Sequence, residues 1–173
     1  MTDANTNKAD RLSATLRQEI DEQLAKFPDD QRQSAVLGAL RSVQHHDPQH
    51  YLSTEMMDAV AAYIGMSEIA VYEVASFYSM YNLEPVGKHE ISVCTNISCM
   101  LRGSDQVVEH LENRLNIKLG ETTADGQIFL KKEEECLAAC CGAPMMQVDH
   151  VYHEHLTIEK IDKLLEKLGA NHD

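Results

Sequence analysis

The chain has 173 residues, of which 43% are hydrophobic and 5% aromatic, and its formal net charge is −13. This length accommodates one domain or two small ones, with an aliphatic core. The negative charge argues against a nucleic-acid partner and against adsorption to an anionic membrane, because both need a basic surface. No stretch approaches the roughly 18 consecutive apolar residues of a membrane-spanning helix, so we expect no membrane insertion.

The first ten residues are polar and contain two Asp and one Lys. This composition is typical neither of a secretory signal nor of an Arg-rich transit peptide. We therefore expect a protein of the reducing cytoplasm, where disulfides are the less frequent fate of cysteine.

The first half of the chain predicts a small helical domain over residues 10–84, preceded by a disordered tail over 1–9. A helix is expected over 10–26, where Leu12, Leu16, Ile20 and Leu24 recur every four residues. A second helix is expected to begin at Asp30, which resembles a capping box with Gln33.

Two further helices are expected in this domain. Ser53 and Ser67 are predicted to be their N-caps, and Gly65 the C-cap of the first. Apolar residues of the last helix are expected to supply core surface: Ile69, Val71, Tyr72, Ala75 and Phe77.

The pattern changes at Pro85, and residues 85–173 predict a second domain. Strands are expected over 89–94, 127–132 and 144–149, with a short one at 151–152. Helices are expected after Ser104 and Thr157, each as an N-cap, and Ile158 is expected to face inward. The resulting order β-α-β-β-β-α is that of an α+β or α/β layer in which helices pack on a small sheet.

All five cysteines lie in two clusters within this second domain. Cys94 and Cys99 form a C-x4-C pair, and Cys136, Cys140 and Cys141 follow after 36 intervening residues. Clustered thiols of this kind are typical of an iron–sulfur cluster, a zinc site or a redox pair. No C-x-x-C occurs, which disfavours the redox pair. Zinc knuckles have about two to four residues between ligands, and the C-x4-C and C-x3-C pairs lie at the wide end of this range. Wider loops favour a [2Fe–2S] cluster, and zinc stays an alternative.

Several segments resemble one known family. They are Tyr63-Ile-Gly-Met-Ser, Val71-Tyr-Glu-Val-Ala-Ser-Phe-Tyr-Ser-Met-Tyr81, Pro85-Val-Gly-Lys-His and the two cysteine clusters with their flanks. Together these segments are similar to the 24-kDa (E) subunits of complex I, the NADH:quinone oxidoreductases. The resemblance extends from about residue 10 to residue 169.

This resemblance implies a fold and a site. The fold is α+β: a small N-terminal helical domain followed by a thioredoxin-like α/β [2Fe–2S] ferredoxin domain. The cluster ligands of the family correspond here to Cys94, Cys99, Cys136 and Cys140. Cys141 is then expected to be a buried or idle thiol.

The resemblance also implies a function. The chain is expected to be an electron-transfer subunit without an active site of its own, whose cluster exchanges electrons with the flavin of a flavin- and NADH-binding subunit. Other complex I subunits are further expected partners, and the expected location is the peripheral arm of a membrane-bound complex on the cytoplasmic face. The same family supplies subunits of NAD-linked formate dehydrogenases and NAD-reducing hydrogenases, which remain an alternative, as does a zinc-stabilised interaction module.

Charged residues near the cysteines are candidates for tuning such a cluster. Carboxylates at 133–135 would oppose its reduction, although a solvated acidic segment also explains them. Arg102 is expected to donate to sulfur or to face water. A metal site at His150, His153 and His155 is the weakest candidate, because their spacing suits a surface strand and turn.

Overall fold

The computed structural model describes residues 8–132 and 136–169. The chain divides into two compact units, Met1–Pro85 and Val86–Asp173, called the helical unit and the α/β unit below. None of the described helices is long and apolar enough to cross a membrane.

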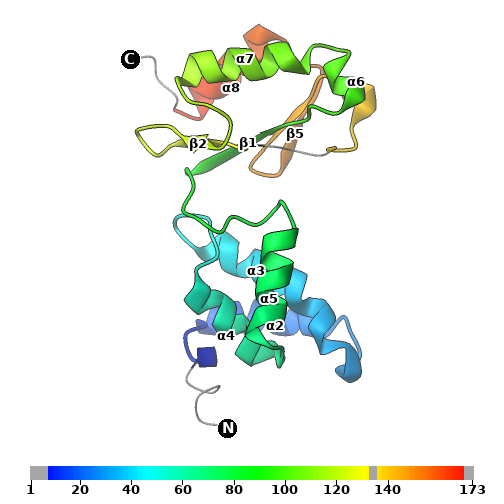
Figure 1. The fold of residues 1–173 in the computed structure, drawn as a ribbon, viewed down its shortest axis with the longest axis vertical. Helices are drawn as coiled ribbons and strands as arrows, with labels where there is room; N and C mark the ends of the chain where they lie inside the picture. Colours follow the sequence, from blue (N-terminus) through cyan, green and yellow to red (C-terminus); the bar gives the residue numbers. More distant parts are fainter. Residues whose placement is uncertain (1–7, 133–135, 170–173) are drawn as a thin grey trace. The chain divides into compact units, whose positions relative to one another are not determined.

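The helical unit follows the predicted order of helices (Figure 1). Ser53 and Ser67 cap α4 and α5 as predicted, since each hydroxyl accepts a hydrogen bond from the amide three residues on, and Gly65 ends α4 with φ 86°. The elements of this unit are α2 (Ala14–Leu24), the 3₁₀ helix η1 (Asp29–Ala35), α3 (Val36–His46), α4 (Thr54–Ile64) and α5 (Glu68–Phe77).

The predicted capping box at Asp30 is wrong. Asp30 lies inside η1, and α3 begins only at Val36, without a side-chain cap. The amide of Val36 donates instead to the carbonyl of Gln33, so the preceding 3₁₀ turn satisfies a group that a cap would otherwise satisfy.

Two residues predicted for the core of this unit are exposed. Ile69 is 64% and Phe77 is 80% exposed, whereas Val71 and Ala75 are buried. Residues two apart on a helix point in different directions, so a stripe through Val71 and Ala75 leaves Ile69 and Phe77 outside.

The predicted tail over 1–9 is wrong at its last two residues. Residues 1–7 lie outside the described part, but Lys8 and Ala9 form a helical turn. The Lys8 ammonium pairs with the Asp58 carboxylate at 3.0 Å and with the Glu68 carboxylate, which ties it to α4 and α5.

The α/β unit contains a five-stranded sheet in the order β2-β3-β1-β4-β5. β1 runs parallel to β3 and antiparallel to β4, with Ile91 opposite both Leu130 and Val148. The sequence does not predict β2, and the other strands lie within the predicted segments or one residue beyond. The elements are β1 (His89–Val93), α6 (Ile97–Met100), α7 (Ser104–Leu115), β2 (Glu121–Thr122), β3 (Ile128–Leu130), the 3₁₀ turn η2 (Cys140–Gly142), β4 (Met146–Val148), β5 (Val151–His153) and α8 (Ile158–Lys167).

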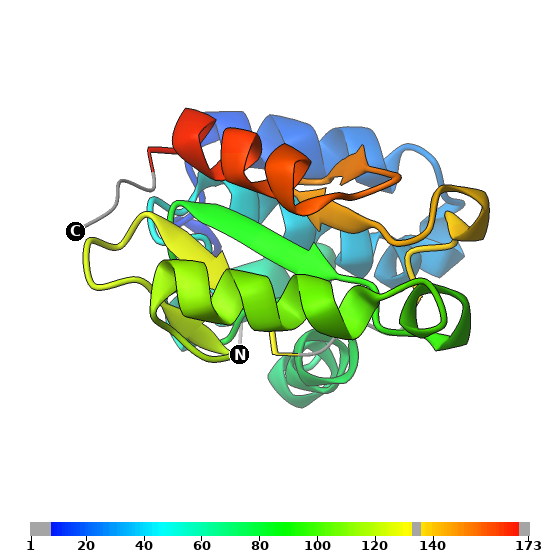
Figure 2. The same cartoon turned by 90° about the horizontal axis from the view of Figure 1, so that it is seen from above.

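Two helices cover one face of this sheet. In Figures 1 and 2, α7 and α8 lie on the same side of the strands. His110 on α7 and Asp162 on α8 are joined by a 2.8 Å hydrogen bond. Alternate strand residues are buried with inward residues of both helices in one core: Ile91, Val93, Ile128, Leu130, Met146, Val148, Val107, Leu111, Ile161 and Leu165.

Two end residues of these helices differ from prediction. Thr157 caps α8 as expected, but Ile158 is 40% exposed because it occupies the first helical position, before the buried stripe begins. Ser104 is the first residue of α7 rather than its cap, because Gly103 with φ 93° takes the cap position. The Ser104 hydroxyl is buried, and it has no hydrogen-bond partner in the part of the chain that the structure describes.

Candidate functional site

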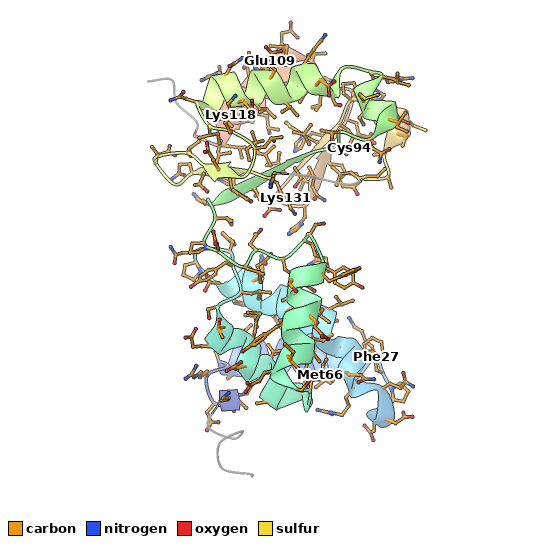
Figure 3. All side chains as sticks on the ribbon, viewed as in Figure 1. Phe27, Met66, Cys94, Glu109, Lys118 and Lys131 are labelled. Carbon is orange, nitrogen blue, oxygen red and sulfur yellow. The ribbon has the colours of Figure 1, made fainter. Side chains whose placement is uncertain are left out.

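The sheet topology brings both cysteine clusters to one end of the α/β unit. Cys94 directly follows β1, and the second cluster lies between β3 and β4. Because β3 is parallel to β1 and β4 antiparallel, the chain leaves β3 and enters β4 at the carboxyl end of β1. Figures 1 and 2 show α6 and the segment of η2 at this end, and Figure 3 places Cys94 there.

Cys94 and Cys99 form the buried half of the site, with 2% and 1% exposure. The Cys94 amide donates to the Met145 carbonyl at 3.2 Å, which continues the pairing of β1 with β4. Asn96 caps α6 by accepting from the Ile97 amide at 2.8 Å, and this turn carries Cys99 back toward Cys94. A small core encloses the pair: Leu137, Ala139, Ala143 and Met145.

Cys136 and Cys140 form the exposed half. The Ala138 amide donates to the Cys136 sulfur at 3.4 Å, and Ala138 has a left-handed φ of 57°. Cys140 lies in η2, and a cis peptide at Ala143–Pro144 leads on to β4. This half therefore lies on a loop rather than on the end of a long strand.

The two halves contact each other through sulfur. Burial opposes ionisation of Cys94, but its pKa is lowered overall because the backbone amides of Leu137 and Asn96 and the thiols of Cys99 and Cys136 donate to its sulfur. Burial and the Cys94 thiolate together raise the pKa of Cys99 to about 11, and the charge of Cys140 acts in the same direction. Cys94 therefore contacts both Cys99 of the first cysteine pair and Cys136 of the second cysteine group.

Three further predictions for the site concern Cys141, Arg102 and the carboxylates at 133–135. Cys141 is exposed, so of its two expected states, buried or idle, the buried one is wrong. Arg102 faces water at the surface. The carboxylates at 133–135, predicted to tune the site, lie outside the described residues.

Sequence reasoning missed the backbone donors. The amides of Leu137 and Ala138 reach sulfur only because of the left-handed turn at Ala138, and no residue type marks that turn in advance. Asn96 was also missed, although an Asn just before a short helical segment is a preferred N-cap.

In residues 8–132 and 136–169, no group of three or more His, Cys, Asp or Glu side chains is arranged to hold one metal ion. This includes His150, His153 and His155, which lie in and beside β5. A [2Fe–2S] cluster, in contrast, takes two pairs of thiolates, one pair for each iron.

Comparison with known families identifies this architecture. The model of the thioredoxin-like [2Fe–2S] ferredoxin family matches residues 20–169. The chain belongs to this family. The fold and the [2Fe–2S] cofactor expected from the sequence are those of the family.

Curated relatives cover most of the chain. The E 2 subunit of the NADH-quinone oxidoreductase of Rhizobium meliloti (strain 1021) is 41% identical over 156 residues, which are 90% of each chain. The E subunit of the NADH-quinone oxidoreductase of Rickettsia conorii (strain ATCC VR-613 / Malish 7) is 41% identical over 159 residues, or 92% of each chain. These relatives are subunits of an oxidoreductase complex, as the sequence resemblance predicts.

A solved structure shares the fold. A chain of an NAD+-reducing [NiFe]-hydrogenase in the air-oxidised state superposes with a TM-score of 0.66 at 22% identity, over 81% of this chain. This chain spans only 24% of the hydrogenase chain. At this identity the likeness concerns the fold alone.

The donors at the site fit a [2Fe–2S] cluster. Such a cluster needs four thiolates and gains from hydrogen bonds to sulfur. The two loops present five thiols, and backbone amides donate to three of them, those of Cys94, Cys99 and Cys136. The chemistry of the donor set therefore agrees with the family's cofactor.

Proposed function

We propose that this chain is the electron-transfer subunit of an NADH:quinone oxidoreductase. The observation that carries the proposal is the sulfur contact of Cys94 with both Cys99 and Cys136, which joins two cysteine loops 36 residues apart in a chain that belongs to a [2Fe–2S] family. The names of the curated relatives support the choice of complex.

The proposed ligands are Cys94, Cys99, Cys136 and Cys140. Cys94 accepts hydrogen bonds from Cys99 and Cys136, and Cys140 is near enough for its charge to raise the pKa of Cys99. Cys141 follows Cys140 directly, but among residues 8–132 and 136–169 it does not contribute to the pKa shifts of Cys94 and Cys99. We therefore assign Cys141 no ligand role.

The residues around this site bind and shield rather than react. A bound [2Fe–2S] cluster accepts and releases one electron at a time. Leu137, Ala143 and Met145 exclude water from the buried thiols, and the amides of Leu137 and Ala138 donate to sulfur. Such hydrogen bonds favour the reduced, more negative state. In this proposal the chain has no substrate pocket of its own and acts as a non-catalytic subunit.

The proposed partner is the flavin- and NADH-binding subunit of the same complex, within its peripheral arm at the cytoplasmic face of the membrane. Three apolar side chains beside Cys99 support a docking face here: Ile97 is 67% exposed, Met100 45% and Leu101 77%. An apolar rim next to a redox site gives a partner's cofactor a close approach. The helical unit, proposed as a separate domain over 10–84, is a second candidate for contacts with other subunits.

The test is electron paramagnetic resonance of the anaerobically purified, dithionite-reduced protein, with iron and sulfide analysis. We expect one S = 1/2 [2Fe–2S] signal per chain. The signal should be lost in Cys94→Ser, Cys99→Ser, Cys136→Ser and Cys140→Ser and kept in the matched control Cys141→Ser. Zinc without sulfide in the wild type would instead support a structural zinc module.

The docking face has its own test. Leu101→Glu should abolish co-purification with the flavin- and NADH-binding subunit while leaving the iron content unchanged. Glu109→Gln, on the middle of α7, serves as a surface control. Co-purification with a hydrogenase or formate dehydrogenase subunit in place of that partner would support the alternative assignment.

A further inference from the structure

A carboxylate outside both cysteine loops lies against the second one. A Cβ built on Gly142 would lie 2.5 Å from Cδ of Glu154 and 2.6 Å from its Cβ and Cγ. Gly142 does not have a left-handed φ, so its backbone would accept any residue. The requirement for glycine at this position is therefore one of space: it leaves room for the Glu154 side chain.

Backbone hydrogen bonds hold this arrangement in place. The His155 amide donates to the Gly142 carbonyl at 2.6 Å, and the Leu156 amide donates to the Pro144 carbonyl at 3.0 Å. The segment that follows β5 is thus paired with the segment that follows Cys140. Glu154 precedes the first of these donors, so its position relative to η2 is set by the backbone.

Among the described residues the Glu154 carboxylate has no ion pair or hydrogen bond, although the Lys160 ammonium donates to the carbonyl of the neighbouring His155 at 2.8 Å. The Glu154 side chain crosses Gly142, two residues from the proposed ligand Cys140. It therefore packs on the turn that carries Cys140, in the exposed half of the site.

We propose that Glu154 is an electrostatic tuning residue, whose carboxylate, held over Gly142, lowers the reduction potential of the cluster. This inference rests on the proposed function. One-electron reduction makes an all-cysteinate [2Fe–2S] centre more negative by one charge, and a neighbouring carboxylate opposes that change by Coulomb repulsion. Gly142 contributes by leaving the space in which the carboxylate approaches the ligand loop.

The test is the midpoint potential of the intact protein, measured by a redox titration that follows the [2Fe–2S] signal. Glu154→Gln keeps the shape of the side chain and removes its charge, so we expect the potential to rise. Glu154→Asp keeps the charge and should stay nearer to the wild type. Gly142→Ala, which displaces the Glu154 side chain, should raise the potential in the same direction.

A matched control separates a local effect from one of net charge. Glu166→Gln removes the same charge near the end of α8, eight residues after Ile158 and so about 12 Å farther along the helix. Its shift should be less than half that of Glu154→Gln. The shift of Glu154→Gln should also shrink in high salt, because ions screen a partly solvated charge.

The outcomes separate this inference from the proposed function. A normal signal with equal shifts in Glu154→Gln and Glu166→Gln would overturn the tuning role alone. A shift in Gly142→Ala without one in Glu154→Gln would also overturn it, because the loop backbone would then be the cause. Absence of a [2Fe–2S] signal in the wild type would overturn the proposed function and this inference together.

Discussion

The two cysteine loops differ in how the fold holds them. Cys94 and Cys99 are almost fully buried, at the end of the central strand and on a capped helical turn. Cys136 and Cys140 are exposed and lie on a loop whose main local contacts are a 3₁₀ turn and amide–sulfur hydrogen bonds.

This difference indicates that the two cysteine pairs are ordered by different interactions. Packing organises the buried pair before any iron arrives, since its surroundings belong to the protein core. The exposed pair has fewer such contacts, so its order depends more on the bonds between sulfur and iron. The site is thus half preformed, and the exposed half is the one beside which Glu154 lies.

Removal of the cluster should affect the two loops unequally. We expect backbone amides at 137–142 to exchange at least about ten times faster in the cluster-free protein, and those at 94–101 less than about threefold faster. Hydrogen-exchange mass spectrometry of both forms measures this. Equal acceleration in the two loops would contradict the idea of a preformed half.

The core residues that pack under β1, which leads to Cys94, should contribute most to the free energy of unfolding. Leu111 is fully buried on α7, in the core that also contains Ile91 and Val93 of β1. Leu111→Ala should lower the free energy of unfolding by about 2–5 kcal/mol because it opens a cavity. Leu101→Ala, at a 77% exposed residue, should change it by less than about 0.5 kcal/mol. Urea denaturation of the cluster-free protein gives both values.

Replacement of the cysteines should lower the free energy of unfolding by less than Leu111→Ala does, and by more at the buried Cys99 than at the exposed Cys136. In the cluster-free protein, Cys99→Ser places a hydroxyl in an apolar site and should cost about 1–3 kcal/mol. Cys136→Ser, at an exposed position, should cost less than about 0.5 kcal/mol. If urea denaturation shows the same loss of unfolding free energy for both substitutions, the difference in burial between Cys99 and Cys136 does not affect stability.

The buried pair should also give the cluster-free protein a pH dependence. The pKa of Cys99 rises from 9.0 to about 11, so the native state keeps this proton longer than the unfolded chain does. Its contribution to stability is complete below pH 9 and is lost as the pH rises to about 11. The lowered pKa of Cys94 has the opposite sign, but its contribution no longer changes above pH 9.

The measurement is the free energy of unfolding of the cluster-free protein between pH 9 and pH 11. Wild type should lose stability more steeply than Cys99→Ala across this range. The raised pKa values of Tyr72 and Tyr81, about 12, are present in both proteins and cancel in the comparison. Parallel curves for the two proteins would contradict the assignment to Cys99.

Local features of the fold can be predicted where neighbours along the chain decide the outcome. Ser53, Ser67 and Thr157 are recognisable as caps because capping joins residues three positions apart. The same local reasoning fails at Asp30 and Ser104, where a preceding 3₁₀ turn and a left-handed glycine take over the start of the helix.

The sequence was sufficient to predict the helical first half, the strand segments other than β2, and the cysteine spacing that favours an iron–sulfur cluster. These properties depend on periodicity and residue type over short distances. Three features became known from the fold itself: the strand order, the burial of Cys94 and Cys99 but not of Cys136 and Cys140, and the contact of Glu154 with Gly142. Each of these joins segments apart in the chain, which are brought together by the pairing of β1 with β3 and β4 and by the hydrogen bond from the His155 amide to the Gly142 carbonyl.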